Sequence, residues 1–255
     1  MEIIILLVFS ASIGSFLNVV IYRLPLDKSI VFPASHCPRC ENELKPWHNI
    51  PLISYLVLRG RCAYCHTKIP VRYFLVEALT PLLMLFLYWH FGLSLEFFKN
   101  ALLVLLLIPV VFIDIDHRLI LDKMTIPGTI LGLAFSIFMA PKQFYQPVLS
   151  MLAGGGLLAI VAYAGLLIYK QESMGGGDIK LGAMIGSFTN VESILFALFA
   201  AFFLAALFAV AGMITGKIER RSLVPFGPFI ALGTLVSLGY KNQIVHLYLT
   251  WIGWQ

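Results

Sequence analysis

The feature that most constrains this chain is a series of apolar runs, each about 20 residues long, that recurs from one end to the other. A run of that length is what an α-helix needs to cross the roughly 30 Å hydrocarbon core of a bilayer. Helices satisfy their own backbone hydrogen bonds, which lipid cannot do for them. We therefore expect an all-α polytopic membrane protein of about eight transmembrane helices. Its spans are predicted near residues 3–22, 76–93, 97–115, 125–140, 148–169, 177–190, 191–215 and 224–240.

The composition agrees with a protein that lies in lipid. The chain is 60% hydrophobic and 12% charged, against roughly 45–50% and about 25% in soluble domains. Its net charge of +5 could suggest nucleic acid, but the basic residues sit in short stretches beside the apolar runs, as in cytoplasmic loops. This favours anionic lipid headgroups as the electrostatic partner and argues against nucleic acid.

The distribution of lysine and arginine predicts the orientation of the spans. If the chain starts outside and alternates, most basic residues fall in cytoplasmic segments. The first apolar run lacks the basic start of a signal peptide and exceeds its usual length, so we expect a retained helix. The predicted cytoplasmic segments are 23–75, 117–124, 170–176 and 216–223. The predicted domains are a first helix at 1–22, a cytoplasmic module at 23–75 and a membrane bundle at 76–255.

The cytoplasmic module holds all four cysteines of the chain as two Cys-x-x-Cys pairs, Cys37 with Cys40 and Cys62 with Cys65. Two such turns can present four thiolates tetrahedrally to Zn²⁺. A loop with little core of its own gains folding free energy from a metal. We predict a structural zinc site, because four thiolates leave no open coordination position.

Other interpretations of the cysteines are weaker. A pair of disulfides would need an oxidising compartment, whereas the charge pattern places the module in the cytoplasm. A redox pair is disfavoured because no thioredoxin-like pattern surrounds it. His36, His48 and His66 lie near the pairs, but with four thiolates available we expect them to be bystanders.

Carboxylates interrupt the apolar pattern in two places. Asp114 ends the long apolar run at residues 97–115. Asp178 follows Gly175-Gly176-Gly177 at the start of the run at residues 177–190. Ionisable groups in such segments are costly and typically functional. Two close carboxyl groups that share a proton can activate water, one as base and the other as hydrogen-bond donor to a scissile carbonyl. The glycines would allow close approach of a substrate backbone.

The same residues have other interpretations. Asp178 could be a helix N-cap, for which aspartate is a common choice. Asp114 could belong to a proton or ion pathway, so that an ion-coupled transporter remains an alternative to a protease. A zinc-containing membrane scaffold without chemistry is a third possibility. Asp116 and Asp122 are expected to be solvated loop acids.

Several segments together resemble the type IV prepilin leader peptidases, the bacterial membrane aspartyl proteases with a Gly-x-Gly-Asp motif. They occur in the order of that family over nearly the whole chain. The matching segments are residues 14–25, 37–40, 47–55, 58–62 with Cys65, 114–122, 175–182 and 225–228.

The resemblance implies that Asp114 and Asp178 are the catalytic pair, at the cytoplasmic face of the bacterial inner membrane. It implies substrates that are type IV prepilins or pseudopilins. Leu121 stands where the family commonly has proline, so the turn before Asp122 is expected to be looser.

The resemblance also implies N-methylation of the trimmed pilin with S-adenosylmethionine. A glycine followed by a basic residue before the third cysteine matches Gly60-Arg61, which we assign to methyl transfer. The sequence shows no nucleotide-binding glycine motif, so this assignment depends on the resemblance alone.

Overall fold

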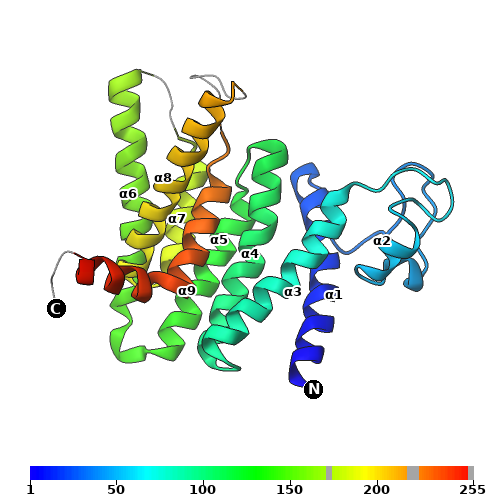
Figure 1. The fold of residues 1–255 in the computed structure, drawn as a ribbon, viewed down its shortest axis with the longest axis horizontal. Coiled ribbons are helices and arrows are strands. Elements are labelled where there is room, and N and C mark those ends of the chain that lie inside the picture. Colours follow the sequence, from blue (N-terminus) through cyan, green and yellow to red (C-terminus); the bar gives the residue numbers. More distant parts are fainter. Residues whose placement is uncertain (171–173, 217–223, 252–255) are drawn as a thin grey trace. The chain divides into compact units, whose positions relative to one another are not determined.

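The computed structural model describes residues 1–170, 174–216 and 224–251, and within them every long element is an α-helix (Figure 1). This confirms the predicted all-α class. The helices are α1 (Glu2–Arg23), α2 (Ile53–Val57), α3 (Val71–Phe91), α4 (Leu95–His117), α5 (Asp122–Met139), α6 (Tyr145–Tyr169), α7 (Gly176–Phe188), α8 (Val191–Ile214) and α9 (Gly227–Trp251). Short 3-10 turns lie at Leu24–Leu26, Pro46–Asn49 and Pro141–Gln143.

Each predicted span corresponds to one of these helices. Five segments of the described chain are long and apolar enough to cross a membrane: Glu2–Leu26, Val71–Phe91, Leu95–His117, Tyr145–Ile168 and Val191–Ile214. Helix α7 has 13 residues, fewer than the roughly 20 that a perpendicular crossing needs. The total of eight crossings therefore stays a prediction. The predicted cytoplasmic segments 170–176 and 216–223 lie partly outside the described residues.

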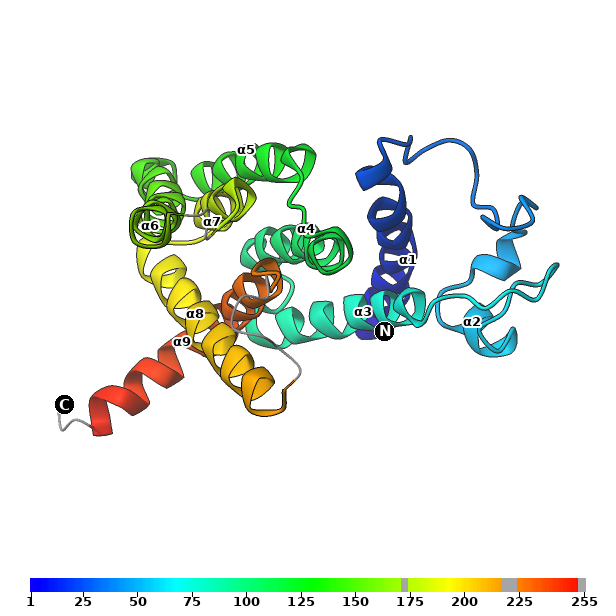
Figure 2. The ribbon, with the colours of Figure 1, turned by 90° about the horizontal axis from the view of Figure 1, so that it is seen from above.

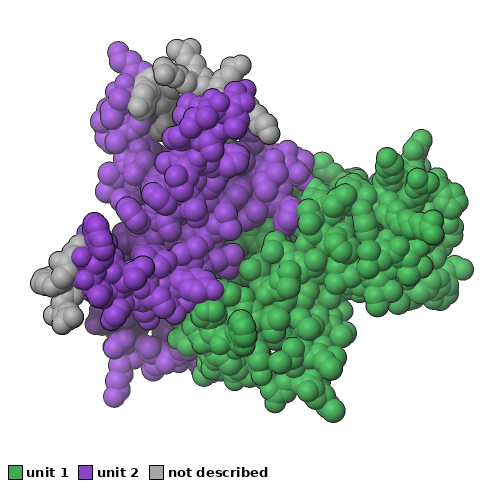
Figure 3. Space-filling model, viewed as in Figure 1, with its two compact units in different colours: residues 1–109 green, residues 110–255 purple. Residues whose placement is uncertain are grey.

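The chain divides into two compact units, Met1–Pro109 and Val110–Gln255 (Figure 3). In the first unit α1 packs along α3. Their backbones come close at Gly14, where a Cβ would lie 3.1 Å from Glu77 Cα. Small residues allow such close approach in helix pairs within lipid. The module that contains the cysteines connects the end of α1 to the start of α3.

In the second unit α7 lies between α5 and α6 (Figure 2), and α8 packs along α9. The α6–α7 contact depends on glycine, because a Cβ at Gly182 would lie 2.9 Å from the carbonyl oxygen of Gly154. One side of α7 is fully buried, with Leu181, Met184 and Ile185 among its core residues. This packing fixes the start of α7, where Asp178 lies.

Candidate active site and metal centre

Asp114 lies in the last turns of α4 and is 5% exposed. Its Oδ2 atom accepts a hydrogen bond of 2.9 Å from the backbone N–H of Gly227. The first N–H groups of a helix have no partner within the helix and carry its positive dipole end, so the start of α9 is a favourable place for a carboxylate. Arg118, one turn further along, also acts electrostatically on Asp114.

Gly227 lies against Asp114, and sequence reasoning predicts no role for it. A Cβ at this position would lie 2.7 Å from Asp114 Oδ2, so only glycine permits the observed approach. The segment Pro225-Phe226-Gly227-Pro228 was visible as part of the family resemblance. Its partner is 113 residues away, and no local pattern could identify that partner.

Asp178 is the third residue of α7, and Gly175 occupies the N-cap position. The interpretation of Asp178 as the N-cap is therefore wrong. Its half-buried carboxylate lies beside the backbone of Gly175, and its charge interacts with that of Asp114. The two carboxylates that the sequence singled out are therefore near enough to interact electrostatically, and their catalytic roles stay a prediction.

The three glycines before Asp178 have different surroundings. A Cβ at Gly177 would lie 2.8 Å from Cβ of Ile120, in the α4–α5 turn, so Gly177 allows that turn to pack against α7. A Cβ at Gly176 would meet nothing within 4 Å. The backbone at Gly176 is accordingly open to an approaching chain.

Asp122 begins α5, and both of its carboxylate oxygens lie 2.7 Å from Lys180 Nζ on α7. Both side chains are about half exposed, and exposed ion pairs typically contribute about 0–1 kcal/mol. Leu121 has a φ of −83° and a ψ of 131°, close to the backbone that proline imposes. Leu121 thus adopts a conformation that proline could also adopt, and the looser turn before Asp122 stays a prediction. Asp116 is exposed, as expected.

The four cysteines converge in the first unit: the Sγ atoms of Cys37, Cys40, Cys62 and Cys65 all lie within 4.8 Å of one another. The two pairs are folded alike. Cys37 N–H donates to Asn42 and Cys62 N–H to Thr67, and the residue after each pair, Glu41 or His66, has a positive φ of 57° or 55°. The repeated turn presents the two pairs of thiols to a common centre.

The cluster fits a tetrahedral metal. Cys37 Sγ and Cys65 Sγ are 3.8 Å apart, which matches the edge of a tetrahedron with metal–sulfur distances of about 2.3 Å. A disulfide would need about 2.05 Å, and all four cysteines are free. Hydrogen bonds with Thr67 lower the pKa of the Cys65 thiol to about 6, whereas burial and the neighbouring thiols raise the pKa of the Cys40 thiol to about 11, so the four thiols ionise unequally.

The nearby histidines do not join the cluster. Among the described residues, the metal-binding group consists of the four cysteines alone. The Nδ1 atom of His36 forms a hydrogen bond of 2.9 Å with the backbone oxygen of Ala34. The residues present could therefore hold a metal such as zinc with an all-cysteine ligand set.

Gly60 and Arg61 lie in the turn before the second cysteine pair. Gly60 has a φ of +65°, and a Cβ there would lie 2.9 Å from Tyr55 Oη. Both the backbone conformation and the nearby Tyr55 side chain therefore favour glycine at this position. The Arg61 side chain is exposed. The first unit contains a cavity of about 210 Å³, and neither Gly60 nor Arg61 lines it.

Comparison with known proteins covers both units. Residues 8–91 match the bacterial peptidase A24 N-terminal domain, and residues 101–210 match the type IV leader peptidase family. All four cysteines fall in the first match, and both Asp114 and Asp178 fall in the second. The chain is similar to proteins named prepilin leader peptidase/N-methyltransferase.

The relative from Myxococcus xanthus is 42% identical over 190 residues, which are 74% of this chain and 57% of that protein. The relative from Pseudomonas aeruginosa is 32% identical over 95% of this chain and 92% of its own length. The relative from Bacillus subtilis is 34% identical over 96% and 97%, respectively. No solved structure matches the chain.

Proposed function

Because this chain belongs to the type IV leader peptidase family, we propose that it removes the leader of type IV prepilins or pseudopilins and then N-methylates the new N-terminal residue. The observation that supports the peptidase is that Asp114 and Asp178 lie near enough to interact electrostatically. One comes from the end of α4 and the other from the start of α7, and their charges interact.

In the proposed reaction the two carboxyl groups share one proton. The ionised group takes a proton from water as the water oxygen attacks the scissile carbonyl carbon, and the protonated group donates a hydrogen bond to the carbonyl oxygen. The peptide C–N bond then breaks, and the leaving nitrogen receives a proton. Asp114 and Asp178 divide these roles between them.

Two backbone features support this chemistry. The Gly227 N–H holds one oxygen of Asp114 at 2.9 Å, which orients the carboxylate without another side chain. The open backbone at Gly176 leaves room beside Asp178 for an extended substrate. Orientation of reacting groups of this kind lowers the barrier by removing the need to order them during reaction.

We place the site at the cytoplasmic face of a bacterial inner membrane. The charge pattern puts residues 23–75 and 117–124 on the same side, and the latter segment begins next to Asp114. A prepilin would present its basic leader there while its hydrophobic segment stays in the bilayer.

For methylation we propose S-adenosylmethionine as donor. When bound, S-adenosylmethionine would supply the methyl group for the terminal amine nitrogen of the trimmed pilin, which would lose a proton as the new bond forms. We assign Gly60 and Arg61 to this activity by resemblance. Zn²⁺ held by Cys37, Cys40, Cys62 and Cys65 would keep the module folded and take no part in the reaction.

The ion-coupled transporter has no support from the relatives reported above, which are named for peptidase and methyltransferase activities. Asp114 lies near the end of α4 and Asp178 near the start of α7. We therefore do not advance transport as a second function.

The peptidase is tested with Asp114→Asn and Asp178→Asn. Each change keeps the shape of the side chain but removes the shared proton, so we expect prepilin cleavage to fall by about 100-fold or more. Conversion is followed on a gel with purified protein and a candidate prepilin. Asp116→Asn is the matched control. Asp116 is an exposed acid on the same helix, so this variant should cleave the prepilin normally. Normal cleavage by either Asn variant would refute the role of that aspartate.

A further inference from the structure

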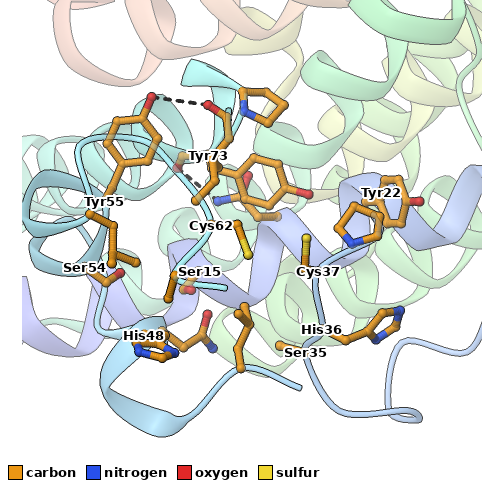
Figure 4. A pocket seen from close by; sticks show the side chains of 18 of the residues that line it. Ser15, Tyr22, Ser35, His36, Cys37, His48, Ser54, Tyr55, Cys62 and Tyr73 are labelled. Carbon is orange, nitrogen blue, oxygen red and sulfur yellow. Dashed lines mark hydrogen bonds between the residues drawn. The ribbon is translucent and has the colours of Figure 1, made fainter. Parts of the chain in front are cut away.

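Helix α2 carries its apolar side chains on the face that points away from the protein. Ile53, Leu56 and Val57 are 60%, 63% and 74% exposed. Positions i, i+3 and i+4 lie on one side of a helix, so these three side chains form one apolar face. On the other side, Ser54 and Tyr55 line the cavity between the module and helices α1 and α3 (Figure 4). A helix in water turns its apolar face toward the core, and α2 does the reverse.

Two contacts fix the position of α2 along α3. The Leu52 N–H, at the N-cap of α2, donates a hydrogen bond of 2.8 Å to Glu77 Oε2. The ring of Tyr55 packs on that of Phe74, with the two centroids 5.4 Å apart. Since α3 begins at Val71, Phe74 and Glu77 lie about 5 and 9 Å along it, at about 1.5 Å per residue. Helix α2 therefore lies beside the first two turns of α3 and not beyond its end.

This position determines what the apolar face of α2 meets. Helix α3 is one of the segments that are long and apolar enough to cross a membrane. When α3 spans the bilayer, as its sequence predicts, its first two turns lie where the headgroups give way to acyl chains. Figure 1 shows α2 level with the upper half of α1, another such segment, and not above the C-terminal end of α1. An apolar face exposed at this depth contacts lipid.

Aromatic rings with basic partners occur at the same level. Arg72 lies over the ring of Tyr73 in the first turn of α3, with 5.7 Å from Cζ to the ring centroid. The module repeats this pairing shortly before α2, where Lys45 Nζ is 5.3 Å from the centroid of the exposed Trp47 ring. Tyrosine and tryptophan collect at membrane interfaces, and long basic side chains extend from there to the headgroups. Trp47 and Lys45 are thus suited to the same interface as the start of α3.

We propose that α2 and Trp47 insert into the lipid leaflet at which α3 begins, so that the cysteine module is anchored on the membrane surface between two spans. An interfacial helix buries its apolar face by about 5–10 Å, which agrees with the contacts at Phe74 and Glu77. The charge of the module also favours lipid: residues 23–75 hold eight basic and three acidic side chains. That excess attracts an anionic leaflet but repels the same module of a second copy.

The test measures the depth of a tryptophan placed in α2. Leu56→Trp is made in the full chain with its four native tryptophans changed to phenylalanine, and the protein is reconstituted in vesicles of phosphatidylethanolamine and phosphatidylglycerol. Phosphatidylcholine brominated near its carbonyls is the shallow quencher, and acrylamide is the aqueous one. We expect the shallow bromines to quench the fluorescence of Leu56→Trp by about twofold or more, because the face lies about 5–10 Å deep.

Asn42→Trp is the matched control, because Asn42 is an exposed polar residue beside the first cysteine pair. Acrylamide should quench this variant and the bromines should not. Limited proteolysis with the wild-type pattern verifies that the module is folded in each variant. Should Leu56→Trp lose that pattern, the chain that keeps Trp47 as its only tryptophan replaces it, with the same expected quenching.

Two results would overturn the proposal. Quenching of Leu56→Trp by acrylamide and not by the bromines would place the apolar face in water. Protection of Leu56→Trp from both quenchers would mean that a second copy of the chain covers the face. Both readouts are independent of prepilin cleavage and methylation, so they do not depend on the proposed function.

Discussion

At the scale of single residues, the site combines an acid that the sequence identifies with a backbone group that it does not. Asp114 is conspicuous because it ends an apolar helix. The Gly227 N–H that bonds to it has no side chain and no local signature of function. Its requirement for glycine follows only from the 2.7 Å that a Cβ would leave to Asp114 Oδ2.

Gly227→Ala should therefore impair cleavage without removing a hydrogen-bond donor. The added methyl group must displace the Asp114 carboxylate, and misplacement of a catalytic group by about 1 Å can cost about 100-fold in rate. We expect a fall in kcat for prepilin cleavage of about 10- to 100-fold. Gly156→Ala is the control, because a Cβ at Gly156 meets nothing within 4 Å. Equal rates for the two variants would show that Asp114 tolerates displacement.

Sequence identifies residues whose chemistry is unusual for their surroundings. The four cysteines, singled out by their repeated spacing, converge in the structure, and Asp114 and Asp178, rare types in an apolar chain, interact electrostatically; their catalytic roles stay a prediction. The Asp122–Lys180 ion pair could not be predicted, because it joins residues 58 apart. Long-range pairs between ordinary charges depend on how helices pack, which no local pattern encodes.

At the scale of elements, the two cysteine pairs of the module lie in turns of the same conformation. Glu41 and His66 have nearly the same left-handed backbone, and the bridges His36–Glu43 and Arg61–Lys68 close the two turns in the same way. These short bridges bury little apolar surface. We expect a module of this kind to gain folding free energy from a metal that joins its two halves.

The module should therefore depend on its metal. Purified protein is expected to contain about one zinc per chain, and Cys62→Ser should lose it and make residues 23–75 sensitive to protease. His66→Ala should keep the metal, because His66 is outside the ligand group. Metal analysis with limited proteolysis measures both. Wild-type protein free of metal, or a Cys62→Ser variant that retains it, would contradict the assignment.

Helix positions were predictable because apolar length determines them. Each expected span has a helix at the same place, but α3 starts five residues earlier than predicted and α9 extends to Trp251. Ends are poorly defined by hydropathy, since polar residues can continue a helix beyond the apolar run. The pairing of α7 with both α5 and α6 was not predictable, because it depends on where glycine removes a side chain from a contact.

At the scale of the whole molecule, the order of the helices places the proposed chemistry on one side of the membrane. Between Asp114 at the end of α4 and Asp178 at the start of α7 lie α5 and α6. Between the cysteine module and Asp114 lie α3 and α4. If each of these helices crosses the membrane, as the sequence predicts, two crossings return the chain to the side from which it left, and all three sites are expected on one face. Cleavage and methylation of one pilin terminus require this arrangement.

That face should be cytoplasmic, because the module is rich in basic residues and the α4–α5 turn contains Arg118. Trypsin added to inverted membrane vesicles should cut at the exposed Arg59 and Arg61, whereas trypsin added to intact spheroplasts should leave them and cut instead at the exposed Lys142, in the α5–α6 turn. The fragments are distinguished by mass, and a cytoplasmic marker protein verifies that the spheroplasts stay sealed. Cleavage at Arg59 or Arg61 in sealed spheroplasts would put the module, and by the count of crossings both aspartates, on the opposite face, where a prepilin leader that has not crossed the membrane could not reach them.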